Sequence, residues 1–423
     1  MRKSIKIRLI IYQILNDVFK NKINFDNLFD QAVKNNELTV IEKSFIFNVC
    51  QNTMRYSIHS KKILKKFIKK KLKINQYILL SSAITQLVFL NVKPYAVVNE
   101  TVEVSKIIKI NSSFINAVLK NITNKIKDLK SIKINKSDFP LWFQKEIDKS
   151  KFINFRVFFN TYFFESSLHI VFKTNKFLEN FNEDFISSSN KSAFVNTKKR
   201  VLELQEYKNG NWWVQNFSSM LPIVLVPDIK NKNILDLCAA PGGKAFQVLS
   251  KNKNIILNDI STKRIKILKE NLIRLKYSAK VTNYNALNFP EDKKFDIVLL
   301  DAPCSAIGTI RGNPEIIFKK KEPNLNGFFE FQKKLLLKSS KLLKPKGIII
   351  YMVCSFFLTE TLEPINSFLK DNKDFTILKY KSYPEELDLN ALLSNKGYFL
   401  TPPTIYKNFK IDGFFSIQLI KNV

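Results

Sequence analysis

LDLCAAPGGK, at residues 235–244, joins a short apolar run to a turn of small residues that leads into a helix-forming segment. Small residues at 239–243 let the backbone approach a ligand closely, and the amide groups at a helix start point toward that ligand. The glycine and lysine spacing is not that of a phosphate-binding loop. The stretch is typical of the first strand and turn of a ligand-binding α/β sheet.

Apolar runs alternate with helical segments on both sides of this turn. The predicted buried parallel strands are residues 234–237, 255–259, 295–301 and 348–354, with helices at 261–276 and 330–343. This alternation favours an open, doubly wound α/β sheet for residues 206–423. The carboxyl ends of such strands share one edge of the sheet, where these folds bind ligands.

Polar residues at the predicted strand ends indicate a nucleoside site. Asp259 ends the strand after the glycine turn, where a carboxylate can accept both hydroxyls of a ribose. Asn285 follows the third strand and is a candidate partner for an adenine edge. We therefore expect the turn, Asp259 and Asn285 to form one binding site.

Two further strand ends carry thiols, in DAPCS at residues 301–305 and in YMVCS at residues 351–355. We expect Asp301, Cys304 and Cys354 to lie together beside the turn, because parallel strands end at the same edge. A thiolate that adds to C6 of a pyrimidine activates C5, provided that a proton or donor at N3 accepts the electron density. Asp301 suits the N3 role. The residues alone leave open which cysteine attacks.

The thiols are expected to be reduced and free. The four cysteines are too scattered for a disulfide framework, and with only two histidines they lack the spacing of a zinc site, so no metal is expected. A free thiol with a pKa of about 8.5 is only slightly ionised at neutral pH. Lys244 or Arg311 nearby is expected to help ionise the nucleophile.

The charge balance favours a polyanionic partner. The chain has 69 basic and 36 acidic residues, a net charge of +33, which favours nucleic acid or an anionic membrane surface. Lys, Asn, Ile and Phe are abundant together, which is typical of a genome with a biased nucleotide composition. Such a bias scatters lysine over any solvated surface, so a lysine-rich run such as 61–73 is interpreted as a solvated helix face. No apolar stretch reaches membrane-spanning length and the first residues lack a cleavage signal, so a cytoplasmic location is expected.

Residues 1–125 are predicted to be all-helical, since apolar residues recur at three- and four-residue intervals. Candidate helices are 10–19, 38–56, 77–90 and 101–110, with a break before Pro94. Residues 126–205 are predicted to be a connector with a small α+β subdomain, including a helix start at 138–142 and a strand at 169–172.

The motifs at 235–244, 301–305 and 351–355 resemble those of bacterial RNA 5-methylcytosine methyltransferases, as do WVQN at 213–216 and DGFF at 412–415. Residues 1–125, with PYAVVNETVE at 94–103, resemble the N-terminal domain of that family, which is similar to NusB. The combined architecture resembles the RsmB (Sun) subfamily, whose members methylate 16S ribosomal RNA.

The resemblance implies an α/β Rossmann-like methyltransferase domain that depends on S-adenosylmethionine, with an all-α NusB-like RNA-binding domain and a small α+β connector. It implies Cys354 as the nucleophile, Cys304 in release of the product and Asp301 facing cytosine N3. Carried over in the same way, the cofactor residues are Cys238, Ala239, Ala240, Pro241, Gly242, Gly243, Lys244, Asp259, Asn285 and Asp301. Asn285 stands where aspartate is usual. The expected partner is 16S ribosomal RNA, with no membrane, no metal and a monomeric state.

Other readings predict different residues. A DNA cytosine methyltransferase would attack with the Pro-Cys cysteine, but Cys354 and the helical N-terminal segment disfavour it. An adenine-N6 enzyme would need Asn/Asp-Pro-Pro-aromatic at 301–304. A non-catalytic RNA-binding or assembly factor is disfavoured because Cys354 and the glycine turn are intact. A transfer RNA or 23S ribosomal RNA substrate, and the choice of cytosine, stay open.

Overall fold

The computed structural model describes residues 2–21, 23–150, 152–197, 199–226, 228–318, 323–380, 387, 389 and 392–422. The chain divides into two units, Met1–Asp148 with Asn313–Glu322 and Lys149–Gly312 with Pro323–Val423. The domain limits predicted after residues 125 and 205 are not the limits of these two units, and they remain predictions. None of the helices in the described ranges combines the length and the hydrophobicity that a membrane-spanning helix needs.

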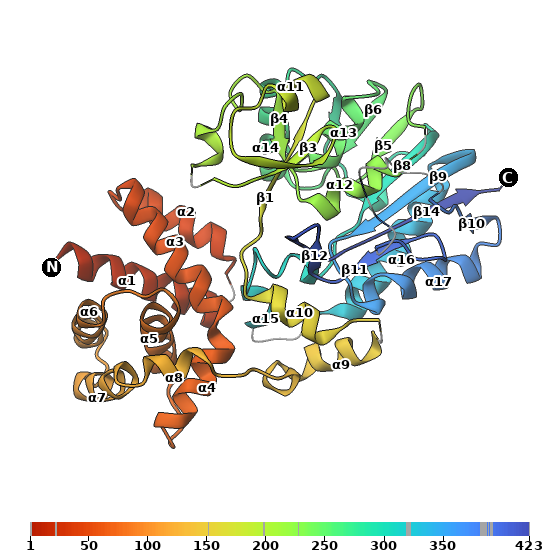
Figure 1. Ribbon diagram of the computed structural model, residues 1–423. Helices are drawn as coiled ribbons and strands as arrows, with labels where there is room; N and C mark the ends of the chain where they lie inside the picture. Colours follow the sequence, from red (N-terminus) through yellow and green to blue (C-terminus); the bar gives the residue numbers. More distant parts are fainter. Residues whose placement is uncertain are drawn as a thin grey trace. The chain divides into compact units, whose positions relative to one another are not determined.

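The first unit is helical, as predicted for its N-terminal part (Figure 1). Thr39 and Glu42 form a reciprocal capping box at the start of α3, and Pro94 is the first residue of α6, where its missing amide hydrogen costs nothing. The helical elements are α1 (Lys3–Asn16), η1 (Asp17–Asn21), α2 (Phe25–Asn35), α3 (Val40–Arg55), α4 (Ser57–Phe67), α5 (Ile74–Ile84), η2 (Thr85–Phe89), α6 (Pro94–Ile107), α7 (Ser112–Thr123), α8 (Ile126–Lys130), η3 (Lys136–Asp138), α9 (Leu141–Lys149) and α15 (Glu315–Phe318).

The second unit contains a small antiparallel sheet with the order β2-β3-β1-β4 among its described strands. Buried Phe172 and Trp212 pack in its own small core. The predicted strand at 169–172 is confirmed as part of β1. The elements of this region are α10 (Phe155–Tyr162), β1 (Leu168–Phe172), α11 (Asn175–Glu179), β2 (Phe185–Ser189), β3 (Ser192–Val195), η4 (Val201–Glu203) and β4 (Trp212–Val214).

The large sheet of the second unit has the order β10-β14-β9-β8-β5-β6-β7, with β11 also paired to β14. The neighbouring strands β9, β8, β5, β6 and β7 are parallel, and β14 is antiparallel to β9. The strands are β5 (Ile234–Asp236), β6 (Ile255–Asn258), β7 (Lys280–Thr282), β8 (Phe295–Asp301), β9 (Leu343–Val353), β10 (Phe375–Ile377), β11 (Phe399–Thr401) and β14 (Phe414–Lys421), beside the hairpin β12 (Thr404–Tyr406) and β13 (Phe409–Ile411).

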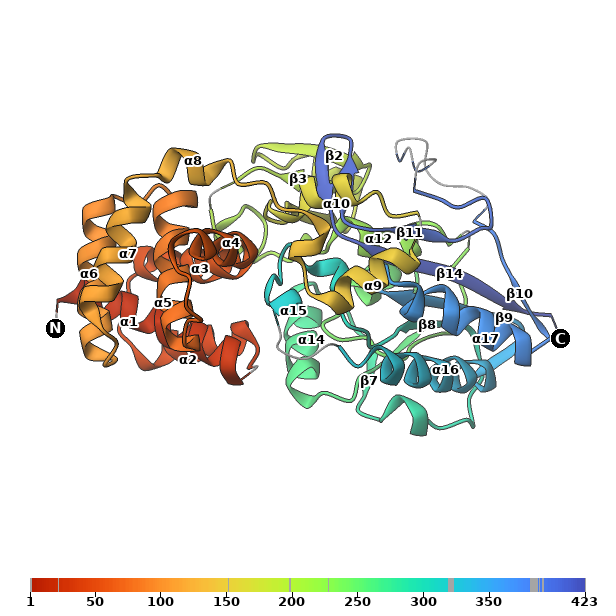
Figure 2. The same ribbon diagram turned by 90° about the horizontal axis from the view of Figure 1, so that it is seen from below.

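Helices cover both faces of this sheet (Figure 2). Leu299 of β8 packs with helices α12 to α14, and its neighbour Leu300 packs with α16 and α17, because successive side chains of a strand point to opposite faces. The helices are α12 (Phe217–Val224), α13 (Gly243–Leu249), α14 (Thr262–Arg274), α16 (Leu325–Lys341) and α17 (Leu362–Asp371), with short turns η5 (Ala286–Asn288), η6 (Ile307–Thr309) and η7 (Leu358–Glu360). The predicted Rossmann-like α/β sheet is confirmed. Its antiparallel strands, β10, β11 and β14, were not predicted from the sequence.

Candidate active site

The glycine turn lies between β5 and α13. Gly242 has φ 116°, which favours glycine, and a Cβ there would lie 2.3 Å from the ring of Phe246. The backbone of the turn borders a cavity of about 330 Å³ beyond the end of β5. This is the edge of the sheet at which a ligand was expected.

The cavity brings together most of the predicted site residues. Its lining includes the whole turn from Cys238 to Lys244, together with Asp301 and Cys354. It also includes residues that the sequence analysis gave no role, namely Gln215, Ser219, Asp236, Thr309 and Asp412. The predicted cofactor turn and the predicted nucleophile therefore border the same space.

Two predicted cofactor residues are not among those that line this cavity. Asp259 is buried, accepts hydrogen bonds from the amides of Ala240 and Ser261, and forms an ion pair of 2.8 Å with Arg264. Asn285 is exposed, and its side chain accepts a hydrogen bond from the amide of Leu287 at the start of η5. Their contacts with ribose and adenine stay predictions.

Asp236 is a buried acid at the end of β5, directly before the turn, and it lines the cavity. Its Oδ1 has no hydrogen-bond partner among the described residues, and only 2% of the residue is exposed. Burial, with the charge of Asp301 second, raises the pKa of Asp236 to about 7. An acceptor of this kind beside a close-approach turn fits a ligand that carries a positive charge, such as a sulfonium nucleoside.

This raised pKa predicts a pH-dependent effect of Asp236→Asn on stability. The native carboxyl holds its proton more tightly than the unfolded one, with its ordinary pKa of 3.8. The wild type therefore loses stability as pH rises toward 7, and the asparagine variant does not. Between pH 5 and 8, the free energy of unfolding of the variant should gain about 2 to 3 kcal/mol on the wild type. Denaturant titrations check this, and parallel pH profiles would contradict it.

The two thiols of the predicted pair are in contact. Asp301 at the end of β8 is paired with Met352 of β9, so the segments after both strands start side by side. The Sγ atoms of Cys304 and Cys354 lie 3.3 Å apart. The hydrogen bond with Cys354, followed by burial, raises the pKa of the Cys304 thiol well above its usual range. One cysteine of the pair is thus favoured as a neutral thiol.

The two cations expected near the thiols are engaged with carboxylates. Lys244 Nζ lies 2.7 Å from Asp301 Oδ2 and 3.0 Å from Ser219 Oγ. Arg311 is fully buried and forms an ion pair with Asp412. Lys244 is therefore the ion-pair partner of Asp301, and Arg311 is that of Asp412.

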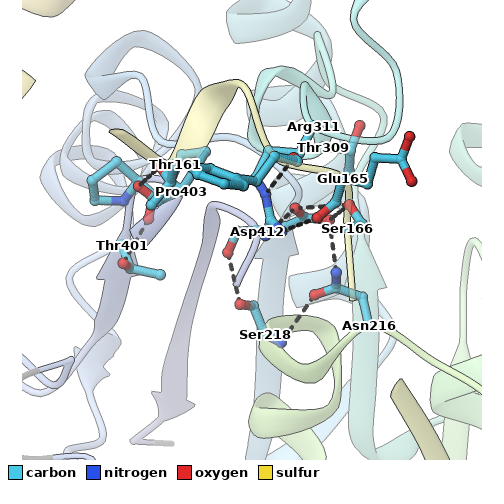
Figure 3. Close-up of polar contacts among 12 residues, drawn as sticks. Thr161, Glu165, Ser166, Asn216, Ser218, Thr309, Arg311, Thr401, Pro403 and Asp412 are labelled. Carbon is cyan, nitrogen blue, oxygen red and sulfur yellow. Dashed lines mark hydrogen bonds and ion pairs between the residues drawn. The ribbon is translucent and has the colours of Figure 1, made fainter. Parts of the chain in front are cut away.

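Asp412 joins several segments at the cavity (Figure 3). Its carboxylate accepts hydrogen bonds from Asn216 at 2.7 Å and from Ser166 at 3.3 Å, and its backbone oxygen accepts one from Ser218 at 2.7 Å. The contact with Asn216 connects the two family motifs at 213–216 and 412–415. Both motifs were visible in the sequence, but their partnership was not.

A close backbone contact holds the segment that contains Cys354. The amide of Gly308 donates to the carbonyl of Cys354, and the amide of Gly413 donates to the carbonyl of Gly308, both at 2.9 Å. A Cβ on Gly308 would lie 2.0 Å from the oxygen of Gly413. No side chain larger than hydrogen fits there without movement of the backbone.

We therefore expect Gly308→Ala to lower the free energy of unfolding by about 3 kcal/mol, because the added methyl group overpacks the contact. Gly312→Ala is the matched control, since a Cβ there meets its nearest atom at 3.6 Å, and its effect should stay within about 0.5 kcal/mol. Urea denaturation measures both. Equal effects of the two substitutions would refute this account of Gly308.

The sequence of the chain matches two protein families. Residues 222–420 match the family described as 16S rRNA methyltransferase RsmB/F, and residues 5–124 match the NusB family. The chain is 27% identical to a ribosomal RNA small subunit methyltransferase B of Shewanella oneidensis, over 90% of this chain and 91% of that protein. It is 26% identical to a protein of Bacillus subtilis named as a probable enzyme of the same kind, over 88% and 90%.

A solved structure shares the fold. The crystal structure of PH0851 superposes with a TM-score of 0.72, covering 100% of this chain and 99% of that one at 21% identity. The family match over residues 222–420 and the two relatives define a ribosomal RNA methyltransferase that depends on S-adenosylmethionine. Residues 222–420 thus belong to the RsmB/F methyltransferase family, and residues 5–124 belong to the NusB family.

Proposed function

We propose that this enzyme methylates C5 of a cytosine in 16S ribosomal RNA through a covalent adduct between Cys354 and C6 of the base. The single observation that supports it best is the 3.3 Å contact of Cys304 and Cys354 at the cavity that Cys354 shares with Asp301 and the glycine turn. A pair of thiols beside an acid suits a base that must be activated by addition at C6 and then released.

In this mechanism Cys354 adds as a thiolate to C6, and the electron pair of the C5–C6 double bond moves toward C5. Asp301, paired with Lys244, donates a proton to N3, and the protonated N3 takes up the electron density that develops on the ring. S-adenosylmethionine supplies the methyl group that C5 receives.

Release of the product reverses the addition. A base takes up the C5 proton, its bonding electrons re-form the C5–C6 double bond and the Cys354 thiolate is expelled, and N3 returns its proton to Asp301. Cys304, in contact with Cys354, assists this step. Its raised pKa fits a group that holds a proton while the neighbouring sulfur leaves.

The cofactor is proposed to lie in the turn from Cys238 to Lys244, with Asp236 and Asp301 as acidic neighbours. The sharp turn at Gly242 and the unpartnered oxygen of Asp236 support this position. Asp259 and Asn285 are proposed to contact the ribose and adenine, which requires their present protein contacts to open or be shared.

The NusB domain is proposed to bind the RNA, and the target cytosine is proposed to leave its stack to reach the cavity. Enzymes that act on bases extrude them, and loops of ribosomal RNA make this inexpensive. If removal of residues 1–125 left RNA affinity and target choice unchanged, the role of this domain would be wrong.

Bisulfite sequencing of ribosomal RNA tests the reaction and its substrate. A cytosine of 16S ribosomal RNA should lose its protection in cells without the gene and regain it with the wild type. If the protected cytosine instead returned in 23S ribosomal RNA or in transfer RNA, that RNA would be the substrate. A wild type that restores growth or ribosome assembly, but never a protected cytosine, would favour the non-catalytic assembly factor.

A further inference from the structure

One buried carboxylate holds both cysteine segments. Glu360, the last residue of η7, has no exposed surface. Its Oε1 accepts a hydrogen bond of 2.5 Å from the amide of Ser305, and its Oε2 accepts bonds of 2.6 Å from the hydroxyls of Ser305 and Ser355. Ser305 follows Cys304 and Ser355 follows Cys354 in the sequence, so these bonds tie together the residues next to the two thiols.

The carboxylate is itself fixed to the sheet. The hydroxyl of Tyr351, in β9, donates a 2.9 Å hydrogen bond to the backbone oxygen of Glu360. Each serine hydroxyl also accepts a bond of 3.3 Å from a nearby amide, that of Ile307 for Ser305 and that of Phe357 for Ser355. A buried carboxylate with several donors forms strong, directional bonds, and its loss leaves those donors without a partner.

We propose that Glu360 is a positioning residue that sets the separation of the Cys304 and Cys354 sulfurs through Ser305 and Ser355. The hydrogen bonds given above join it to the residues that follow the cysteines and to β9, and it is not among the residues that line the cavity. Its catalytic consequence rests on the proposed function, whereas its effect on the distance between the sulfurs does not. Glu360 also contributes, after Cys354 and burial, to the raised pKa of Cys304.

The first measurement is independent of methylation. In a glutathione redox buffer, the two thiols form a disulfide as one glutathione disulfide is reduced to two glutathione molecules, and the equilibrium constant gives their effective concentration. We expect Glu360→Ala to lower this concentration at least tenfold, as identified on the 304–354 peptide by mass spectrometry. Glu360→Gln, which keeps the shape but not the charge, should fall between that variant and the wild type.

The second measurement is kinetic. A shift of about 1 Å in a catalytic group can cost about 100-fold in rate, so Glu360→Ala should lower kcat about 100-fold with KM for RNA little changed. Glu363→Ala is the matched control, because Glu363 is an exposed acid at the start of α17. That variant should match the wild type in both measurements.

The outcomes separate the two proposals. An unchanged effective concentration in Glu360→Ala, or a tenfold fall with unchanged kcat, would overturn the positioning role. A tenfold fall in a protein whose wild type never methylates cytosine would support the sulfur separation and refute the reaction. If Glu360→Ala fails to fold, Ser355→Ala removes the bond between Glu360 and the Cys354 segment, whereas Ser305→Ala removes the hydroxyl bond to the Cys304 segment and keeps the amide bond. The same two measurements on Ser355→Ala then decide, and Ser305→Ala should show the smaller effect.

Discussion

Replacing Cys354 with alanine is expected to lower methylation by about 10⁴-fold or more, as the loss of a nucleophile does in other enzymes. Replacing Cys304 with alanine is expected to leave the protein covalently attached to its RNA. The reason is the division of work that we propose for the two sulfurs. Without Cys354 no bond to C6 forms, whereas without Cys304 the bond forms and the methylated base is not released.

The adduct can be measured directly. Denaturing gels of protein mixed with labelled 16S ribosomal RNA and S-adenosylmethionine should show a slow band for Cys304→Ala and none for Cys354→Ala. Cys50→Ala is the control variant, because Cys50 is buried in the core of the helical unit. This variant should retain full activity. The opposite pattern, with an adduct only in Cys354→Ala, would assign the attack to Cys304.

Asp301→Asn is expected to lower kcat by about 10²- to 10⁴-fold, the usual range for loss of a positioned acid or base. The amide cannot exchange a proton with Lys244, which lies 2.7 Å from the carboxylate, so N3 of the cytosine would have no proton source. Single-turnover rates with saturating S-adenosylmethionine measure this step separately from cofactor binding.

Asp296→Asn provides the matched control for that substitution. Asp296 lies near the opposite end of β8, and its carboxylate is also paired with a lysine, Lys344, at 3.1 Å. Its loss should leave kcat unchanged. If Asp301→Asn raised only the KM for S-adenosylmethionine, Asp301 would be a cofactor residue with no role at N3.

The strands and turn of the site were predictable because their signals are local. The apolar run 295–301 was predicted with the same limits that the structure gives to β8, and the turn at Gly242 follows β5 as expected. Parallel strands end at one edge, so the sequence alone predicts that Asp301, Cys304 and Cys354 lie near one another. Nothing local distinguished the role of one cysteine from that of the other.

The supporting contacts were not predictable in the same way. Glu360 and Asp412 act through partners that are distant in sequence, such as Ser305 and Asn216. A single sequence does not show such pairings. A usable signal was the serine that follows each cysteine of the pair, with an acid, Glu360, shortly after the second one. The position of β14 was also missed, since an apolar run near 414–421 does not reveal which strand it joins.

The placement of β14 has a consequence for how the enzyme is made. This strand follows all the other described strands of the large sheet in the sequence, yet it lies between β9 and β10. While the chain emerges from the ribosome, the edge of β9 that later pairs with β14 therefore stays unpaired. Unpaired strand edges are prone to pair with other chains. Asp412 and Gly413, which bind Arg311 and Gly308, arrive only with that strand. A nascent chain thus carries both cysteines well before its catalytic centre can close, and truncated products would be exposed to aggregation.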